Sequence, residues 1–242
     1  MINITGKQRV SQLSLRSILH FLFFRWHIYF QLPLDCFCNV RNIAIMTVVC
    51  LGVEGCTNQS HKLPVLGNPN IAQNDTTYPV VPAFKFINQD GLVITNKTFD
   101  GKIYIADFIF LSCPSICPKM TREMSEVYKT YKTNPNILFI SHTIDPKNDT
   151  MSRLKAYAHN LGVDTKKWFF VTGNKETIYS LAEDGYFATA YSDSTAPGGY
   201  VHSGGLLLID KNKHIRGVYD GTRPKETERL KSDIKKLLNE QF

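Results

Sequence analysis

From about residue 80 onward, short apolar runs alternate with amphipathic stretches. Residues 102–110 (KIYIADFIF) and 136–144 (NILFISHTI) are nearly continuous apolar runs, the pattern of strands buried on both faces of a sheet. Further β-like runs cover residues 80–88, 91–96, 168–173, 205–210 and 215–220. Helical patterns cover residues 118–131, about 149–161, 175–185 and about 225–238. Such alternation, closed by a hairpin and a helix, predicts an α/β fold: a central mixed β-sheet flanked by helices.

The N-terminal third is organised differently. Val40–Cys56 (VRNIAIMTVVCLGVEGC) has a positive residue, an apolar run of signal-peptide length and a small residue before a cysteine. This favours a bacterial lipoprotein leader over residues 1–55, with Cys56 as the lipidated first residue of the mature chain. An uncleaved membrane anchor is the alternative. Residues 1–39 fit a signal peptide poorly, so we expect translation to begin near Val40 or Met46.

Residues 56–79 are polar and rich in Asn, Pro and Gly, which predicts a lipidated tether between a membrane and a domain over residues 80–242. The lipid would place that domain in the cell envelope, on the extracytoplasmic (periplasmic) side. The formal net charge is +7, but the basic residues are scattered without interleaved aromatics, which argues against nucleic-acid binding.

The stretch LSCPSICPKM carries the candidate chemistry, since Cys113 and Cys117 lie between a buried strand and a helix N-terminus. The other four cysteines end at Cys56, so these two would be the only thiols of the mature domain. A helix N-terminus stabilises thiolate, which is both nucleophile and metal ligand. Cysteines four apart in a helical turn have Cβ atoms about 5–6 Å apart, wider than the roughly 3.8 Å of a disulfide. Chelation therefore suits them better, although a disulfide staple and a redox pair stay open.

A stable metal site needs a third ligand, and His202 is the strongest candidate. It lies on a Gly-rich approach to an apolar strand, in APGGYVHSGGLLLID, where a loop can bring a side chain toward a neighbouring strand end. We expect His61, His159 and His214 to be solvated. We expect His142 to be hydrogen-bonded near the core.

Two thiolates and one imidazole suit trigonal Cu(I), and can hold Cu(II) with a weak extra oxygen. Zinc is the alternative, but a closed zinc site would want four ligands. Met120 and Met124 fall on the apolar stripe of the helix, which indicates core packing. Asp145 precedes a proline and is expected to shape a turn, with a supporting role beside the metal as the alternative. Asp149 is expected to cap the next helix.

These motifs resemble the SCO/SenC family of thioredoxin-fold copper proteins, in its bacterial lipoprotein form. The resemblance covers about residues 80–238, through DFIFLSCPSICPKM, SHTIDPKNDT, VHSGGLLLID and IRGVYDGT. It implies a thioredoxin-like fold, Cys113, Cys117 and His202 as copper ligands, and Asp145 in the family's Asp-Pro turn. It also implies a metallochaperone for the binuclear copper centre of cytochrome c oxidase, or a protein that reduces that centre's cysteines so that copper can enter. The implied partner is that enzyme's copper-bearing subunit or another copper or thiol protein.

Two other functions stay open. In a thiol–disulfide oxidoreductase, one of Cys113 and Cys117 attacks a client disulfide and the other resolves the mixed disulfide. That activity needs no metal and is indifferent to His202. A tethered redox or copper sensor would show neither copper transfer nor turnover. The sequence alone leaves the enzyme question undecided.

Overall fold

The computed structural model describes residues 62–72 and 75–242, and these form a seven-stranded mixed sheet with the strand order β11-β10-β5-β6-β7-β3-β4. The central strands β5, β6 and β7 run parallel, and β3, β4, β10 and β11 pair antiparallel at the two sides. The strands are β3 (Lys85–Asn88), β4 (Val93–Thr95), β5 (Ile103–Ile109), β6 (Ile137–Thr143), β7 (Trp168–Thr172), β10 (Gly205–Ile209) and β11 (Ile215–Asp220). The predicted central mixed sheet is confirmed.

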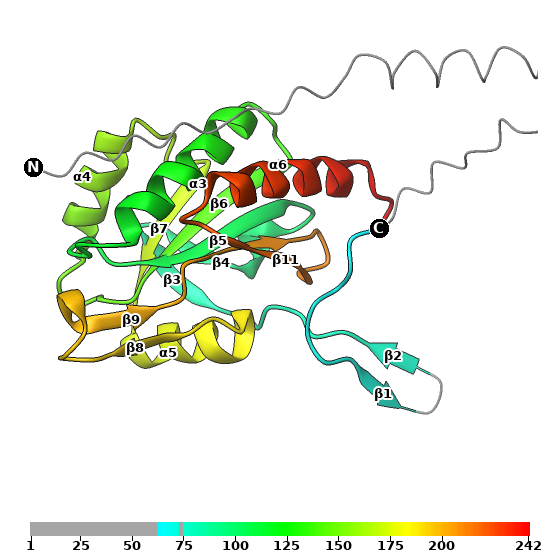
Figure 1. Ribbon diagram of the computed structural model, residues 1–242, viewed down its shortest axis with the longest axis horizontal. Helices are drawn as coiled ribbons and strands as arrows, with labels where there is room; N and C mark the ends of the chain where they lie inside the picture. Colours follow the sequence, from blue (N-terminus) through cyan, green and yellow to red (C-terminus); the bar gives the residue numbers. More distant parts are fainter. Residues whose placement is uncertain (1–61, 73–74) are drawn as a thin grey trace, which may run out of the picture. The chain divides into compact units, whose positions relative to one another are not determined.

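Helices cover both faces of this sheet, as Figure 1 shows. On one face lie α3 (Cys117–Tyr131), α4 (Met151–Leu161) and α6 (Pro224–Asn239). On the other lie α5 (Lys175–Ser180), a π-helical turn (Leu181–Gly185), and a hairpin of β8 (Ala190–Ser192) and β9 (Tyr200–His202). Every residue of β5 and β6 is buried, as expected for strands covered on both sides.

Three local features differ from the sequence-based expectations. Strands β8 and β9 lie in the Ser- and Gly-rich segment expected to be a loop. Helix α4 is capped by Thr150, whose side chain accepts the Arg153 N–H, so the prediction that Asp149 is the cap was wrong by one residue. A hairpin of β1 (Asn70–Ala72) and β2 (Asp75–Thr77) lies in the expected tether.

The expected tether also contacts the domain. Leu63 and Leu66 pack against the core, and the Leu66 N–H donates to the carbonyl oxygen of Ile215. The buried guanidinium of Arg216 donates to the carbonyl oxygens of Leu63 and Pro64. The chain is therefore fixed to the domain before residue 80. Among the described residues, no helix is long and apolar enough to cross a membrane.

Candidate metal centre

The cysteine pair lies where β5 passes into α3. After β5 ends at Ile109, a short loop carries Cys113, and Cys117 is the first residue of the helix. The N-cap residue Ile116 offers no side-chain acceptor, and the Cys117 N–H donates instead to Sγ of Cys113 at 3.4 Å. A sulfur thus caps the positive end of α3, where negative charge is stabilised.

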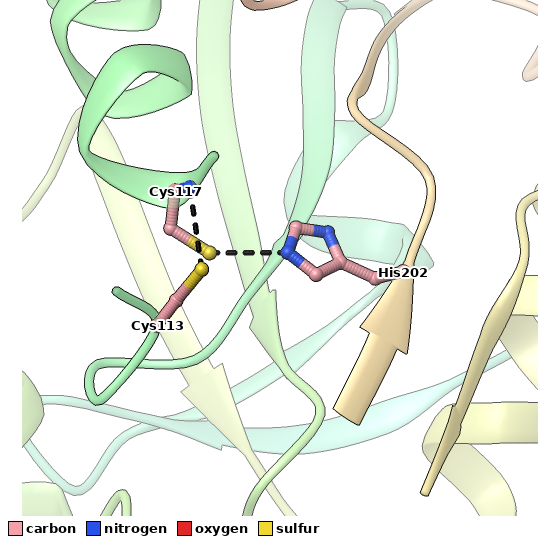
Figure 2. Close-up of side chains that lie close together, drawn as sticks. All are labelled: Cys113, Cys117 and His202. Atoms are coloured by element: carbon pink, nitrogen blue, oxygen red, sulfur yellow. Dashed lines mark hydrogen bonds between the residues drawn. The ribbon is translucent and has the colours of Figure 1, made fainter. Parts of the chain in front are cut away.

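His202 approaches the same sulfurs from the opposite side, at the end of β9 (Figure 2). Its Nε2 lies 3.1 Å from Sγ of Cys117, and its Nδ1 lies 3.0 Å from the carbonyl oxygen of Ser203. A carbonyl oxygen only accepts, so Nδ1 carries the ring proton and Nε2 turns its lone pair toward the thiol of Cys117. Fixing one ring nitrogen in this way orients the other as a metal ligand.

The three side chains form one buried cluster. The two Sγ atoms and a ring nitrogen of His202 all lie within 4.8 Å of one another. Thiolates that share a trigonal or tetrahedral ion at about 2.3 Å stand roughly 4 Å apart, so one ion can reach all three atoms. Both cysteines are free thiols. The structure therefore brings together the three residues expected to bind a metal.

The two thiols have different protonation behaviour. Burial opposes ionisation of Cys113, but hydrogen bonds from the backbone N–H groups of Ser115 and Cys117 outweigh it and lower the pKa of the Cys113 thiol. Burial raises the pKa of Cys117 far above its usual range, and the nearby Cys113 and Asp107 add to that shift. Burial also lowers the pKa of His202, which keeps the imidazole neutral. Cys113 is thus the more readily ionised thiol, Cys117 keeps its proton in the metal-free site, and His202 offers a neutral ring nitrogen.

Asp145 does not reach the cluster as a ligand, but it contacts the hairpin that carries His202. Its Oδ1 accepts a hydrogen bond from the Tyr200 hydroxyl at 2.8 Å, and its Oδ2 accepts one from the side chain of Asn148 at 2.8 Å. Asp149 is fully buried, and its Oδ2 accepts the Leu111 N–H at 3.1 Å, beside the cysteine loop. Both carboxylates thus contact, from one turn, segments that carry residues of the cluster.

The other histidines that the structure describes, His142, His159 and His214, lie apart from the cluster. His159 is exposed on α4, as predicted, whereas His214 is half-buried and its Nδ1 lies 3.1 Å from the carbonyl oxygen of Pro79. The prediction of a hydrogen-bonded His142 was wrong, because both its ring nitrogens are buried without a hydrogen-bond partner among the described residues. His61 and Cys56 lie outside the described residues.

Met120 and Met124 are fully buried in the core, which confirms their predicted packing role. Sequence reasoning missed Asp107, which faces Ser141 of β6 within the doubly buried strand β5. Neither of its carboxylate oxygens has a hydrogen-bond partner of good geometry among the described residues, and burial raises its pKa to about 7 despite the nearby Ser141 hydroxyl. The signal was an acidic residue in the middle of a continuous apolar run.

Comparison with protein families gives a match to the SCO1/SenC model over residues 72–239. The chain belongs to the SCO1/SenC family. It is 32% identical to a SCO1 protein homolog of Bacillus subtilis over 159 residues, which cover 65% of this chain and 82% of that protein. The family assignment and the thioredoxin-like fold predicted from the motifs are therefore confirmed.

Solved structures agree with this assignment. A SCO1/SenC family lipoprotein from Bacillus anthracis is 31% identical, with a TM-score of 0.60 over 66% of this chain and 95% of that one. BsSco, described as a Sco family cytochrome c oxidase assembly protein with a disulfide switch, is 29% identical, with a TM-score of 0.60 over 69% and 98%. ScoI of Bradyrhizobium japonicum, solved with copper bound, shares the fold at 23% identity and a TM-score of 0.53, over 63% and 98%.

Proposed function

We propose that this chain binds copper through Cys113, Cys117 and His202 and passes it to the binuclear copper centre of cytochrome c oxidase. The observation that carries the proposal is the buried cluster in which two sulfurs and an imidazole nitrogen lie within 4.8 Å of one another. Soft thiolates with one imidazole suit Cu(I). The relatives support the choice of metal and of acceptor, because ScoI was solved with copper and BsSco is described as an oxidase assembly protein.

The geometry favours a site that releases its cargo. Nε2 of His202 faces the thiol of Cys117, so binding a cation there replaces one proton between sulfur and nitrogen. Three protein ligands leave the ion open to a fourth from a partner. Copper can then pass by ligand exchange, in which a partner thiolate joins the ion before a ligand of this chain leaves. Because His202 already lies beside Cys117, binding needs no large movement of the hairpin.

An anaerobic Cu(I) titration against a competing chelator tests the copper site. The full chain is used in detergent with Cys36, Cys38, Cys50 and Cys56 changed to serine, so that only the two domain thiols remain. We expect one tightly bound ion per chain, at least tenfold weaker binding for His202→Ala, and no change for the exposed control His159→Ala. Equal affinity in wild type and His202→Ala would remove His202 from the site.

A thiol–disulfide oxidoreductase is the second candidate, and the accessibility of Cys113 favours it. Cys113, but not Cys117, lines a surface cavity of about 170 Å³ together with Ile116, Pro197 and His202. A client disulfide can therefore reach one sulfur, with the other placed to resolve the mixed disulfide. Reduction of a disulfide peptide without metal, at the same rate in wild type and His202→Ala, would favour this candidate over copper delivery.

The cellular placement is part of the proposal. We propose that residues 1–55 are a leader and that Cys56 is the lipidated residue. Residues 56–79 would then be the lipidated segment, and residues 80–242 the thioredoxin-like domain on the extracytoplasmic side of a membrane. The similarity to a Bacillus anthracis lipoprotein supports the lipid anchor. Mass spectrometry of the protein made in a bacterium should show a mature chain that begins with diacylated Cys56. A Cys56→Ser variant should remain unprocessed.

A further inference from the structure

The position of His202 depends on a small hairpin outside the main sheet. Strands β8 and β9 pair with each other and not with the strands of the seven-stranded sheet. The ladder hydrogen bonds that fix a strand within a sheet are therefore missing between this hairpin and the strands below it. Just beyond His202, the carbonyl oxygen of Gly204 accepts the Gly221 N–H at 2.8 Å, and side-chain contacts hold the rest of the hairpin over the cysteine pair.

One of these contacts is part-buried and charge-assisted. The hydroxyl of Tyr200, two residues before His202, donates to Oδ1 of Asp145 at 2.8 Å. Asp145 is only 3% exposed, and the Asn148 side chain donates to its second oxygen at 2.8 Å, which fixes the acceptor. Hydrogen bonds to an ionised carboxylate are about twice as strong as neutral ones. A carboxylate oxygen accepts, so the Tyr200 hydroxyl is the donor in this bond.

The turn that carries Asp145 also holds the cysteine loop. Asp149 accepts the backbone N–H of Leu111 at 3.1 Å and the hydroxyl of Thr143 at 2.6 Å. Residues 143–149 thus contact the segment before Cys113 through one carboxylate and the hairpin before His202 through the other. This turn therefore links the cysteine loop to the hairpin that carries His202.

The aromatic ring of Tyr200 makes separate contacts. It packs against Phe110 with ring centroids 5.2 Å apart, and Phe110 in turn lies edge-on to His202 at 5.8 Å. A phenylalanine at position 200 would keep this ring packing and lose only the hydroxyl. The hydrogen bond can therefore be removed without removing the ring.

We propose that Tyr200 is a positioning residue, whose hydrogen bond to Asp145 holds His202 against the cysteine pair and sets how fast copper leaves the site. This inference rests on the proposed function. When the bond is made, the hairpin keeps Nε2 beside Cys117 and the ion has three ligands. When it breaks, His202 leaves with the hairpin, and the two-coordinate ion is open to a partner thiolate.

The test is the rate at which Cu(I) passes to excess chelator, measured by anaerobic stopped flow. It uses the full chain in detergent with the four cysteines up to Cys56 changed to serine. The variants are Tyr200→Phe, His202→Ala and the double variant. The matched control is Tyr191→Phe on the same hairpin, since Tyr191 is 48% exposed and its hydroxyl has no hydrogen-bond partner among the described residues.

We expect Tyr200→Phe to release copper about tenfold faster, as loss of a charge-assisted hydrogen bond allows. Tyr191→Phe should match wild type. In the His202→Ala background, Tyr200→Phe should have no further effect, whereas a merely structural role would accelerate release in both backgrounds. Equal rates for Tyr200→Phe and wild type, or the same acceleration without His202, would overturn the inference. If His202→Ala itself left copper binding unchanged, both the proposed copper site and the inference about Tyr200 would be wrong.

Discussion

His142 should make the fold sensitive to acid, which the variant His142→Leu tests. The imidazole is fully buried among Phe84, Phe86, Phe108 and Tyr186, with ring centroids 5.1 to 5.8 Å away. Neither ring nitrogen has a hydrogen-bond partner among the described residues. Protonation would therefore place an uncompensated charge in an aromatic environment, and burial lowers the pKa of His142 from 6.5 to about 3.

The magnitude follows from linkage between protonation and folding. Between pH 6.5 and 3 the unfolded chain binds a proton at His142 and the folded chain does not. The titration of His142 therefore leaves the free energy of unfolding unchanged above pH 6.5 and lowers it as the pH falls toward 3. Each pH unit in this window removes about 1.4 kcal/mol, which amounts to roughly 2 kcal/mol at pH 5. This is a large share of the typical 5–15 kcal/mol free energy of unfolding.

Urea unfolding at pH 7 and pH 5, followed by circular dichroism, measures the effect. The change in packing caused by His142→Leu shifts stability equally at both pH values, so the difference between them isolates the titration. We expect the variant to gain about 2 kcal/mol relative to wild type on going from pH 7 to pH 5. His159→Leu, on the exposed face of α4, is the control and should show no such gain. If both variants follow the pH dependence of wild type, the reasoning about His142 is refuted.

Three further predictions concern other buried residues. Asp107→Asn should stabilise the fold by about 4 kcal/mol at pH 7 and above, with little effect at pH 4, because burial raises the pKa of Asp107 from 3.8 to about 7 and makes its ionisation destabilising. A constant urea midpoint difference across this pH range would contradict it. Met120→Ala should lower the free energy of unfolding by about 2–5 kcal/mol and leave Cu(I) affinity unchanged, whereas weakened affinity would make Met120 a ligand. Arg216→Ala should cost about 3–5 kcal/mol in urea unfolding, since it leaves Asp210 buried without its partner at 2.9 Å, and a loss below 1 kcal/mol would refute this.

The sequence predicted the central architecture because burial on both faces leaves a direct pattern. A strand without exposed residues reads as an apolar run, and β5 and β6 have no exposed residue. The cysteine pair was equally visible, since Pro118 marks the start of α3 and thereby places Cys117 in its first turn, four residues after Cys113. These features depend on local sequence alone.

The supporting contacts of the site could not be predicted, since they join residues far apart in the chain. Tyr200 and Asp145 are separated by 55 positions, and β8 and β9 have only three residues each in a segment rich in turn formers. His142 shows a different limit. A polar residue in a buried strand implies a hydrogen-bond partner on general grounds, yet its neighbours here are aromatic rings.

X-ray absorption spectroscopy at the copper K edge tests the central claim most directly. The sample is the chain with only Cys113 and Cys117 as thiols, loaded with one Cu(I) under argon. The account predicts two sulfur ligands and one imidazole nitrogen, with the nitrogen signal lost in His202→Ala. A copper shell of sulfur alone in the unaltered site, or an identical spectrum from His202→Ala, would contradict the three-residue copper site.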